Sequence, residues 1–245
     1  MNNTIETILN HRSIRKFEDI PVTDEQLSTV LTAAQQASTS SYMMAYSIIG
    51  VTDPAKKTEL AEITGQAYVK DNGHLLIFCA DLHRHTLKAN EENYENMKPN
   101  LENTEHFLVS AIDAALAAQN AAIAAESMGL GICYIGSIRN QLERVDKILS
   151  LPTHVIPLFG MVLGVPAHSP NQKPRLPKEA VYFENEYRDH TSELEAFDKE
   201  ITSYYQSRSS NNRVDTWTDQ MLRRFTKPMR MDVTDLVQKK GFNKR

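Results

Sequence analysis

Near its N-terminus the chain reads His11-Arg12-Ser13-Ile14-Arg15-Lys16-Phe17, a heptapeptide with three permanent cations, a hydroxyl group and two large apolar side chains. Guanidinium groups offer planar pairs of donors that match phosphate oxygens, and the Ser13 hydroxyl adds another donor. Ile14 and Phe17 can hold the heptapeptide against a core while its cations stay accessible. A solvated basic turn is the simplest interpretation of such a cluster. Binding of a phosphate group is the alternative, and it needs support from the rest of the chain.

Composition and length set the broad class of the protein. A chain of 245 residues that is 41% hydrophobic can bury one substantial core, in one or two domains. There is no apolar N-terminal leader and no uninterrupted apolar run of membrane-spanning length, so neither secretion nor a membrane span is expected. Cys79 and Cys133 both lie in apolar runs, which predicts two buried free thiols and fits a reducing cytoplasm.

Charge is distributed unevenly along the chain. The net charge of −4 argues against a general nucleic-acid binder. Residues 208–245 nevertheless contain ten Lys or Arg and only four Asp or Glu. A basic C-terminal tail on an acidic body indicates a local anionic partner.

Apolar periodicity predicts a mixture of helices and strands. Capping boxes are expected at Asn3 with Glu6 and at Thr23 with Gln26, and Asp53-Pro54 marks another helix start. Continuous apolar runs predict buried strands. The expected strands are 47–51, 75–80, 129–137 and 154–164, and the later helices are expected over 105–127, 139–149 and 192–205.

Several further segments are candidates for ligand contact. A loop at 37–41 contains Thr39 and Ser40, whose small hydroxyl side chains would let a ligand approach the backbone, and Gln66 follows the helix that begins at 54. The strand at 129–137 starts like a dinucleotide fingerprint, but it lacks the third glycine and follows a helix, which excludes a Rossmann site. Its last four residues are Tyr134, Ile135, Gly136 and Ser137.

Other polar segments support simpler expectations. His83 and His85 could form a metal pair, but no second cluster of ligands complements them, so no metal site is expected. Residues 90–105 are acidic and are expected to form an exposed excursion. The alanine-rich helix at 105–127 allows close approach of neighbouring elements and is a candidate for a subunit interface.

Two basic segments lie in the C-terminal third. Two prolines hold Lys173 and Arg175 in an extended arrangement within Lys173-Pro174-Arg175-Leu176-Pro177, which is either a surface linker or an anion-binding segment. Arg208 and Arg213 flank Ser209-Ser210-Asn211-Asn212, whose small donors could fold around an anion.

The order and spacing of these motifs resemble the nitroreductase/flavin reductase family over nearly the whole chain. The C-terminal region is similar to that of the larger, group A members, which are oxygen-insensitive NADPH nitroreductases. The resemblance implies an α+β, nitroreductase-like fold, with a mostly antiparallel central sheet wrapped by helices and a single domain over 1–245 that carries a basic extension from about 190. It also implies an intertwined homodimer. Composition and periodicity alone indicate only a mixed α/β protein.

The resemblance also implies a function and a set of site residues. The expected activity is FMN-dependent, ping-pong reduction by NADPH of small-molecule oxidants such as nitroaromatics, quinones or free flavins. The sequence has no Ser/His/Asp or Cys/His constellation that would require a catalytic residue. The resemblance implies that the flavin carries the chemistry. The implied NADPH contacts are Arg208 and Arg213. The implied FMN contacts are His11, Arg12, Ser13, Arg15, Thr39, Ser40, Gln66, Tyr134, Ile135, Gly136, Ser137, Lys173 and Arg175.

Two other functions fit the same motifs. One is a different activity on a flavin fold, such as a dehalogenase or a flavin-destructase, and the other is a non-catalytic flavin-binding or sensor protein. The basic tail favours an enzyme, because a sensor has no need of a site for the 2′-phosphate of NADPH.

Overall fold

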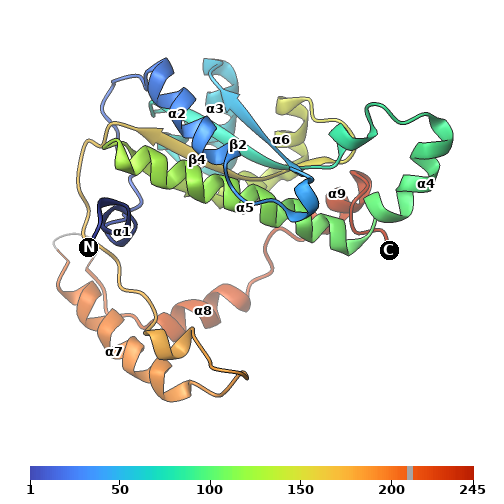
Figure 1. Ribbon diagram of the computed structural model, residues 1–245. Coiled ribbons are helices and arrows are strands. Elements are labelled where there is room, and N and C mark those ends of the chain that lie inside the picture. Colours follow the sequence, from blue (N-terminus) through green and yellow to red (C-terminus); the bar gives the residue numbers. More distant parts are fainter. Residues whose placement is uncertain (209–211) are drawn as a thin grey trace. The chain divides into compact units, whose positions relative to one another are not determined.

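The computed structural model describes residues 1–208 and 212–245. Its centre is a four-stranded sheet in the order β1-β2-β4-β3, in which every neighbouring pair is antiparallel (Figure 1). The strands are β1 (Tyr46–Val51), β2 (His74–Asp81), β3 (Gly131–Ile135) and β4 (Val155–Gly164). All four predicted strands are therefore confirmed, and so is the α+β class with its antiparallel sheet.

Helices cover both faces of the sheet because alternate strand residues are apolar on both sides. One face packs against α2 (Asp24–Gln35) and α5 (Thr104–Ser127), and the other packs against α3 (Pro54–Thr64) and α6 (Leu142–Leu149). Cys133 belongs to the second face and is buried, as is Cys79, and both thiols are free, as the sequence predicts. The predicted helix at 139–149 is instead a 3-10 turn, Gly136–Gln141, followed by α6.

The cap residues of the helices largely follow the sequence. Thr23 and Gln26 form a complete capping box at α2, and Asp53 caps α3 with Pro54 in its first turn. The cap expected for α1 (Asn3–Leu9) is wrong by one residue. The side chain of Asn2, not Asn3, accepts the hydrogen bond from the Ile5 N–H, because the helix already begins at Asn3.

The α5 helix is the central helix of the fold, and it extends almost as predicted. By length and composition it could cross a membrane, which the sequence reading did not expect. Its alanine-rich side contributes to the core against β2 and α2, and the Asp113 carboxylate is buried within it. These contacts are those of a helix in a protein core.

The acidic segment at 90–105 is more ordered than expected. It contains α4 (Glu91–Leu101), which Asn90 caps, and most of its side chains are exposed as predicted. Leu101 and Glu102 are buried, and the Glu102 carboxylate pairs with Arg245 at 2.5 Å. This ion pair attaches the C-terminal segment, which includes α9 (Val233–Lys239), to the end of α4.

Contacts divide the chain into two compact units. The larger unit comprises Met1–Pro170 and Arg230–Arg245, and the smaller unit comprises Asn171–Met229. The smaller unit contains α7 (Thr191–Gln206) and α8 (Trp217–Phe225), which pack around a cluster of Phe197, Ile201 and Tyr205. The helix expected over 192–205 is confirmed by α7, and the single domain expected over 1–245 stays a prediction.

Candidate functional site

The N-terminal heptapeptide is attached to the edge of the sheet. The Ile14 N–H donates to the Ile132 carbonyl of β3 at 2.8 Å, and Ser13 forms a parallel bridge with Ile132. The Ile14 side chain is buried directly over Gly131, where an added Cβ would lie 2.5 Å from Ile14 Cγ1. Ile14 therefore holds the heptapeptide against the core, as the sequence predicts.

Three of the predicted contacts, Ser13, Arg15 and Gln66, come together on one side of β3. Gln66 Oε1 accepts a hydrogen bond from the Tyr68 hydroxyl at 2.8 Å. Burial raises the pKa of Tyr68, and the neighbouring Arg15 opposes that rise. Burial likewise raises the pKa of the Cys133 thiol, with Arg15, Tyr68 and Ser13 acting in the opposite direction. Residues distant in sequence thus form one cluster, the β3 cluster, which consists of Ser13, Arg15, Gln66, Tyr68 and Cys133.

His11 and Tyr134 lie near the same carboxylate, that of Glu126 in α5. His11 Nδ1 is 2.7 Å from Glu126 Oε1, and both side chains are partly buried. Burial, followed by the charge of Glu126, raises the pKa of Tyr134. The Tyr134 ring packs edge-on against Phe159 at a centroid distance of 5.7 Å. The partly exposed ring of Tyr134 is thus held in place by its neighbours.

The segment after β3 offers backbone and small polar groups. Ile135, the last residue of β3, is 1% exposed, and its predicted contact with FMN stays a prediction. A Cβ on Gly136 would lie 3.3 Å from the Arg139 guanidinium. The Ser137 Oγ and the Arg12 Nε are buried without a hydrogen-bond partner among the residues that the structure describes. These two buried polar atoms, which have no partner among the described residues, fit the binding of a polar ligand.

Thr39 and Ser40 are organised around Asp113 of α5. The Thr39 hydroxyl donates to Asp113 Oδ2, and the backbone N–H groups of Ser40 and Ala45 donate to the same carboxylate at 3.1 Å each. Asp113 and Glu126 are separated by about 20 Å along the helix. Within one chain, Thr39 and Ser40 are therefore not brought to His11.

The second predicted phosphate-binding segment lies in the smaller unit. Lys173 and Arg175 are both exposed. Arg175 Nη1 donates to the Lys173 carbonyl at 2.6 Å, and the Lys173 ammonium lies 5.9 Å from the centre of the Tyr205 ring. A joint clamp of these residues with Arg12 and Arg15 stays a prediction.

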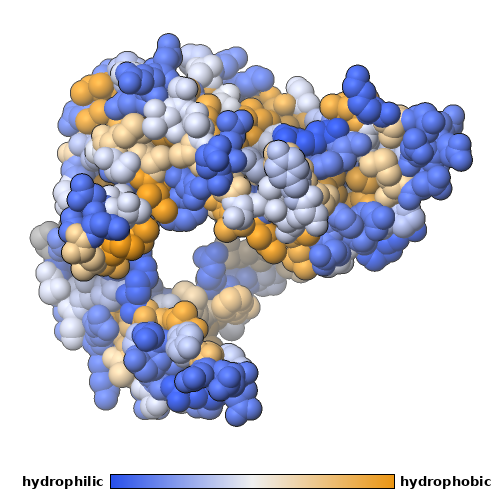
Figure 2. All heavy atoms as spheres, viewed as in Figure 1, coloured by the Kyte–Doolittle hydropathy of each residue, from blue (hydrophilic) through white to orange (hydrophobic). Residues whose placement is uncertain are grey.

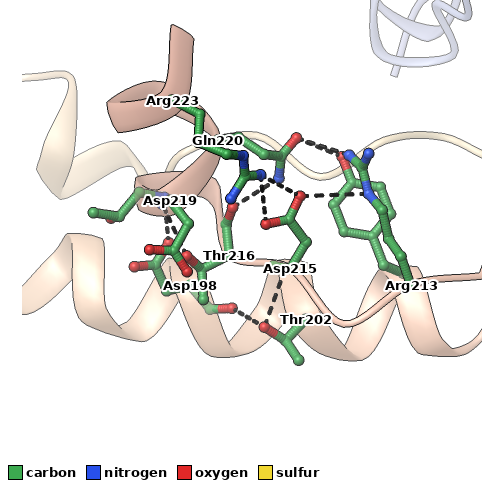
Figure 3. A network of polar contacts seen from close by, with 10 residues as sticks. Asp198, Thr202, Arg213, Asp215, Thr216, Asp219, Gln220 and Arg223 are labelled. Atoms are coloured by element: carbon green, nitrogen blue, oxygen red, sulfur yellow. Dashed lines mark hydrogen bonds and ion pairs between the residues drawn. The ribbon is translucent and has the colours of Figure 1, made fainter. Parts of the chain in front are cut away.

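The two predicted NADPH arginines lie beside the same ring. The guanidinium of Arg208 is 5.9 Å from the Tyr205 centroid and that of Arg213 is 4.1 Å from it. Arg213 also contacts Gln220 and Asp215, and Arg223 binds Asp215 with both contacts below 3 Å (Figure 3). The small donors expected between the two arginines, at 209–211, lie outside the described residues. Arg208, Arg213 and Lys173 form the Tyr205 cluster.

Sequence reasoning missed three residues that organise these sites. Tyr68 lies two positions after Gln66, where the short spacing was a usable signal. Asp113 is a single acid in an alanine-rich helix, and such a charge needs buried partners, which was another usable signal. Tyr205 is 3% exposed and carries no sequence signal beyond its helical spacing from Ile201.

The β3 cluster and its neighbours fit FMN in the chemistry of their donors. Arg12 and Arg15 supply cations, Ser13 and Ser137 supply hydroxyl groups, and Gln66 supplies an amide. No group of three or more possible metal ligands is found in 1–208 and 212–245.

Comparison with known proteins identifies the family. The model of the nitroreductase family matches residues 8–165, and that of the nitroreductase family C-terminal domain matches residues 173–245. The chain is 56% identical over 249 aligned residues, covering all of both chains, to a protein of Bacillus subtilis named FMN reductase (NADPH).

Solved structures give the same result. The NfrA1 nitroreductase of Bacillus subtilis superposes with a TM-score of 0.94 at 55% identity, covering 99% of this chain and 100% of that one. An NADPH:FMN oxidoreductase of Vibrio harveyi, complexed with NAD+, superposes with a TM-score of 0.88 at 40% identity over the whole of both chains. The protein belongs to the nitroreductase family, and the family predicted from the motifs is confirmed.

Proposed function

We propose that this protein is an FMN-dependent oxidoreductase that uses NADPH to reduce small molecules, with nitroaromatics, quinones or free flavins as the substrate class. The observation that carries the proposal is the β3 cluster, in which Ser13, Arg15 and Gln66 converge although they are distant in sequence. The relatives with matching full-length chains are named for NADPH and FMN, which supports the same assignment.

The protein's own groups bind and orient the cofactor in this proposal. Bound FMN supplies the hydride chemistry. Arg12 and Arg15 would donate charge-assisted hydrogen bonds to the FMN phosphate, and Lys173 and Arg175 are the further cations proposed for it. Gln66, kept in place by Tyr68, donates from its amide nitrogen to the ring system, because its amide oxygen is already used as an acceptor. The contact of His11 Nδ1 with Glu126 Oε1 at 2.7 Å orients the His11 ring.

A second copy of the chain completes the proposed site. Thr39 and Ser40 belong to the predicted contacts, yet the helix between Asp113 and Glu126 holds them about 20 Å from His11 in one chain. Leu108, Ile112 and Leu116 of α5 form an exposed apolar stripe at four-residue spacing, with exposed fractions of 49%, 52% and 43%. Patches of orange, apolar surface lie among blue and pale residues where α1 and α5 are located in the larger unit (Figure 2). A homodimer through this face would cover the stripe and bring Ser40 of one protomer to its partner's site.

The two free thiols and the net negative charge fit the proposed cytoplasmic localisation and the proposed partners. Buried, unpaired Cys79 and Cys133 are compatible with the cytoplasm, where thiols stay reduced. The net charge of −4 is unfavourable for nucleic acid, and the partners proposed are small molecules and a second copy of the chain.

An absorbance spectrum followed by stopped-flow mixing tests the function. The purified protein should be yellow, with about one FMN per chain, and NADPH should bleach it in the absence of oxygen. Reoxidation by a quinone or nitroaromatic compound completes the cycle. A colourless protein that takes up no FMN at micromolar concentration would refute the proposal. A yellow protein that NADPH does not bleach would be a flavin-binding protein without this activity.

A further inference from the structure

Tyr205 of α7 is buried, and three cations gather at its ring. Lys173 Nζ and the Arg208 guanidinium each lie 5.9 Å from the ring centroid, and the Arg213 guanidinium lies 4.1 Å from it. Cations within about 6 Å of an aromatic face are attracted by the ring's quadrupole. One side chain thus contacts cations from three separate points of the chain.

The hydroxyl end of Tyr205 reaches the same arginine through Gln220. The Tyr205 hydroxyl donates to Gln220 Oε1 at 3.1 Å, and Arg213 Nη2 donates to that oxygen at 2.9 Å. Gln220 Nε2 donates to the Thr216 carbonyl at 2.8 Å, which fixes the orientation of the amide (Figure 3). Both ends of Tyr205 therefore position Arg213.

Positive charge exceeds negative charge at this cluster. Asp215 is shared by Arg213, at 3.6 Å, and Arg223, at 2.8 Å. In the part of the chain that the structure describes, no carboxylate forms an ion pair with Lys173 or Arg208. Burial by itself raises the pKa of Tyr205, but Arg213 and Lys173 outweigh it and lower the pKa below its ordinary value. The surplus suits a dianion.

We propose that Tyr205 is a positioning residue that presents Arg208, Arg213 and Lys173 together as a site for the 2′-phosphate of NADPH. The inference rests on the proposed function and adds the buried ring to it, because the long side chains of Arg208 and Arg213 alone would not keep a common geometry. In this proposal Lys173 also contacts NADPH, in addition to the role in FMN binding that its motif predicts.

Titration calorimetry with two nucleotides on the FMN-loaded, full-length protein tests the proposal. Adenosine 2′,5′-bisphosphate carries the 2′-phosphate, and adenosine 5′-monophosphate lacks it. Tyr205→Leu should weaken bisphosphate binding about tenfold and leave monophosphate binding unchanged. Tyr205→Phe should retain most of the affinity, because it keeps the ring and loses only the hydroxyl. In kinetic assays with Tyr205→Leu, the KM for NADPH should rise with kcat nearly unchanged.

Phe197→Leu is the matched control, because Phe197 belongs to the same buried cluster and makes none of the cation contacts found among the described residues. It should keep the ratio of the two nucleotide affinities. An unchanged ratio in Tyr205→Leu, or an equal loss in Phe197→Leu, would overturn the role of Tyr205. In Lys173→Ala, measured at saturating FMN, bisphosphate affinity should fall, and unaltered bisphosphate affinity would remove Lys173 from the site. If the parent protein binds the bisphosphate more tightly than the monophosphate but does not oxidise NADPH, the proposed oxidoreductase activity is refuted and the 2′-phosphate site is not.

Discussion

Tyr68 in the larger unit and Tyr205 in the smaller unit each lie beside arginine, yet their pKa values move in opposite directions. Burial raises the pKa of Tyr68 and outweighs the effect of Arg15. Burial also acts on Tyr205, but Arg213 and Lys173 outweigh it and the pKa is lowered. The first tyrosine is thus governed by desolvation and the second by accumulated positive charge.

This difference shows two ways of holding ligand-binding groups. At the β3 cluster, backbone hydrogen bonds and the buried Ile14 fix the heptapeptide, so its cations need few contacts of their own. At the Tyr205 cluster the cations are held by a ring and by shared polar partners. The first arrangement should be sensitive to packing changes, and the second to salt and to loss of individual charges.

The largest expected effect is at the packing contact beneath Ile14. Gly131→Ala would place a Cβ 2.5 Å from Ile14 Cγ1, and overpacking of this kind should lower the free energy of unfolding by about 2–3 kcal/mol and weaken FMN binding. Urea unfolding with flavin fluorescence measures both. Gly129→Ala is the control: its φ is +79° and nothing lies within 4 Å, so only backbone strain of about 1 kcal/mol is expected. Equal losses of unfolding free energy and of FMN binding in the two variants would mean that the close packing of Ile14 on Gly131 has no special role.

Removing individual phosphate-binding cations should have the next largest effect. Arg15→Ala and Arg175→Ala should each weaken FMN binding about 10- to 100-fold, since a hydrogen bond to a charged group contributes about 1.5–3 kcal/mol. The double variant should lose less than the two single losses added together, because both cations are proposed to serve one phosphate.

Fluorescence titration of the flavin-free protein with FMN measures these losses. Lys16→Ala, an exposed cation of the same heptapeptide, should bind FMN as the parent does. FMN affinity at the parent's level in both single arginine variants would show that the clamp is assigned to the wrong residues.

Loss of Arg208, a proposed coenzyme contact, should have an effect of similar or smaller size that is selective for NADPH. Arg208→Ala should raise the KM for NADPH about 10- to 100-fold and leave NADH use nearly unchanged, because only NADPH carries the 2′-phosphate. Added salt should raise the KM for NADPH in the parent, since an exposed ion pair is screened. Arg224→Ala, an exposed arginine of α8, is the control in steady-state assays. A comparable loss with both coenzymes would indicate that Arg208 stabilises the fold instead.

The smallest expected effect is on the tyrosine titrations themselves. The measurement is the tyrosinate absorbance of the parent and of each variant as a function of pH. The component that Tyr205→Phe removes should titrate below pH 10.0, and the component that Tyr68→Phe removes should titrate above it. The raised pKa of Tyr68 implies a contribution to stability that is present below pH 10.0 and lost above it. The lowered pKa of Tyr205 implies a contribution that is present above pH 10.0 and lost as the pH falls through the folded pKa. The reverse order of titration would contradict the comparison of the two sites.

Local structure followed closely from local sequence. The box of Thr23 and Gln26, the Asp53 cap and the apolar strands needed only neighbouring residues, and the structure confirms them. The cap at Asn3 was misplaced by one residue because Asn2 offers the same side chain, so the two positions are equivalent in local terms. The acidic segment was not recognised as helical because α4 has few apolar residues to give a period.

The amino-acid sequence by itself determined the family, the strands and the cationic residues that bind ligands in the proposed function, because these depend on residue type and on spacing along the chain. Tertiary structure decided which of them meet. It joined Gln66 to Tyr68 beside Arg15, held Thr39 on Asp113 far from His11, and placed Lys173 with Arg208 and Arg213 around Tyr205. The physical reason is that each of these contacts depends on the packing of elements that are separated in sequence, and no local pattern of residues encodes that packing.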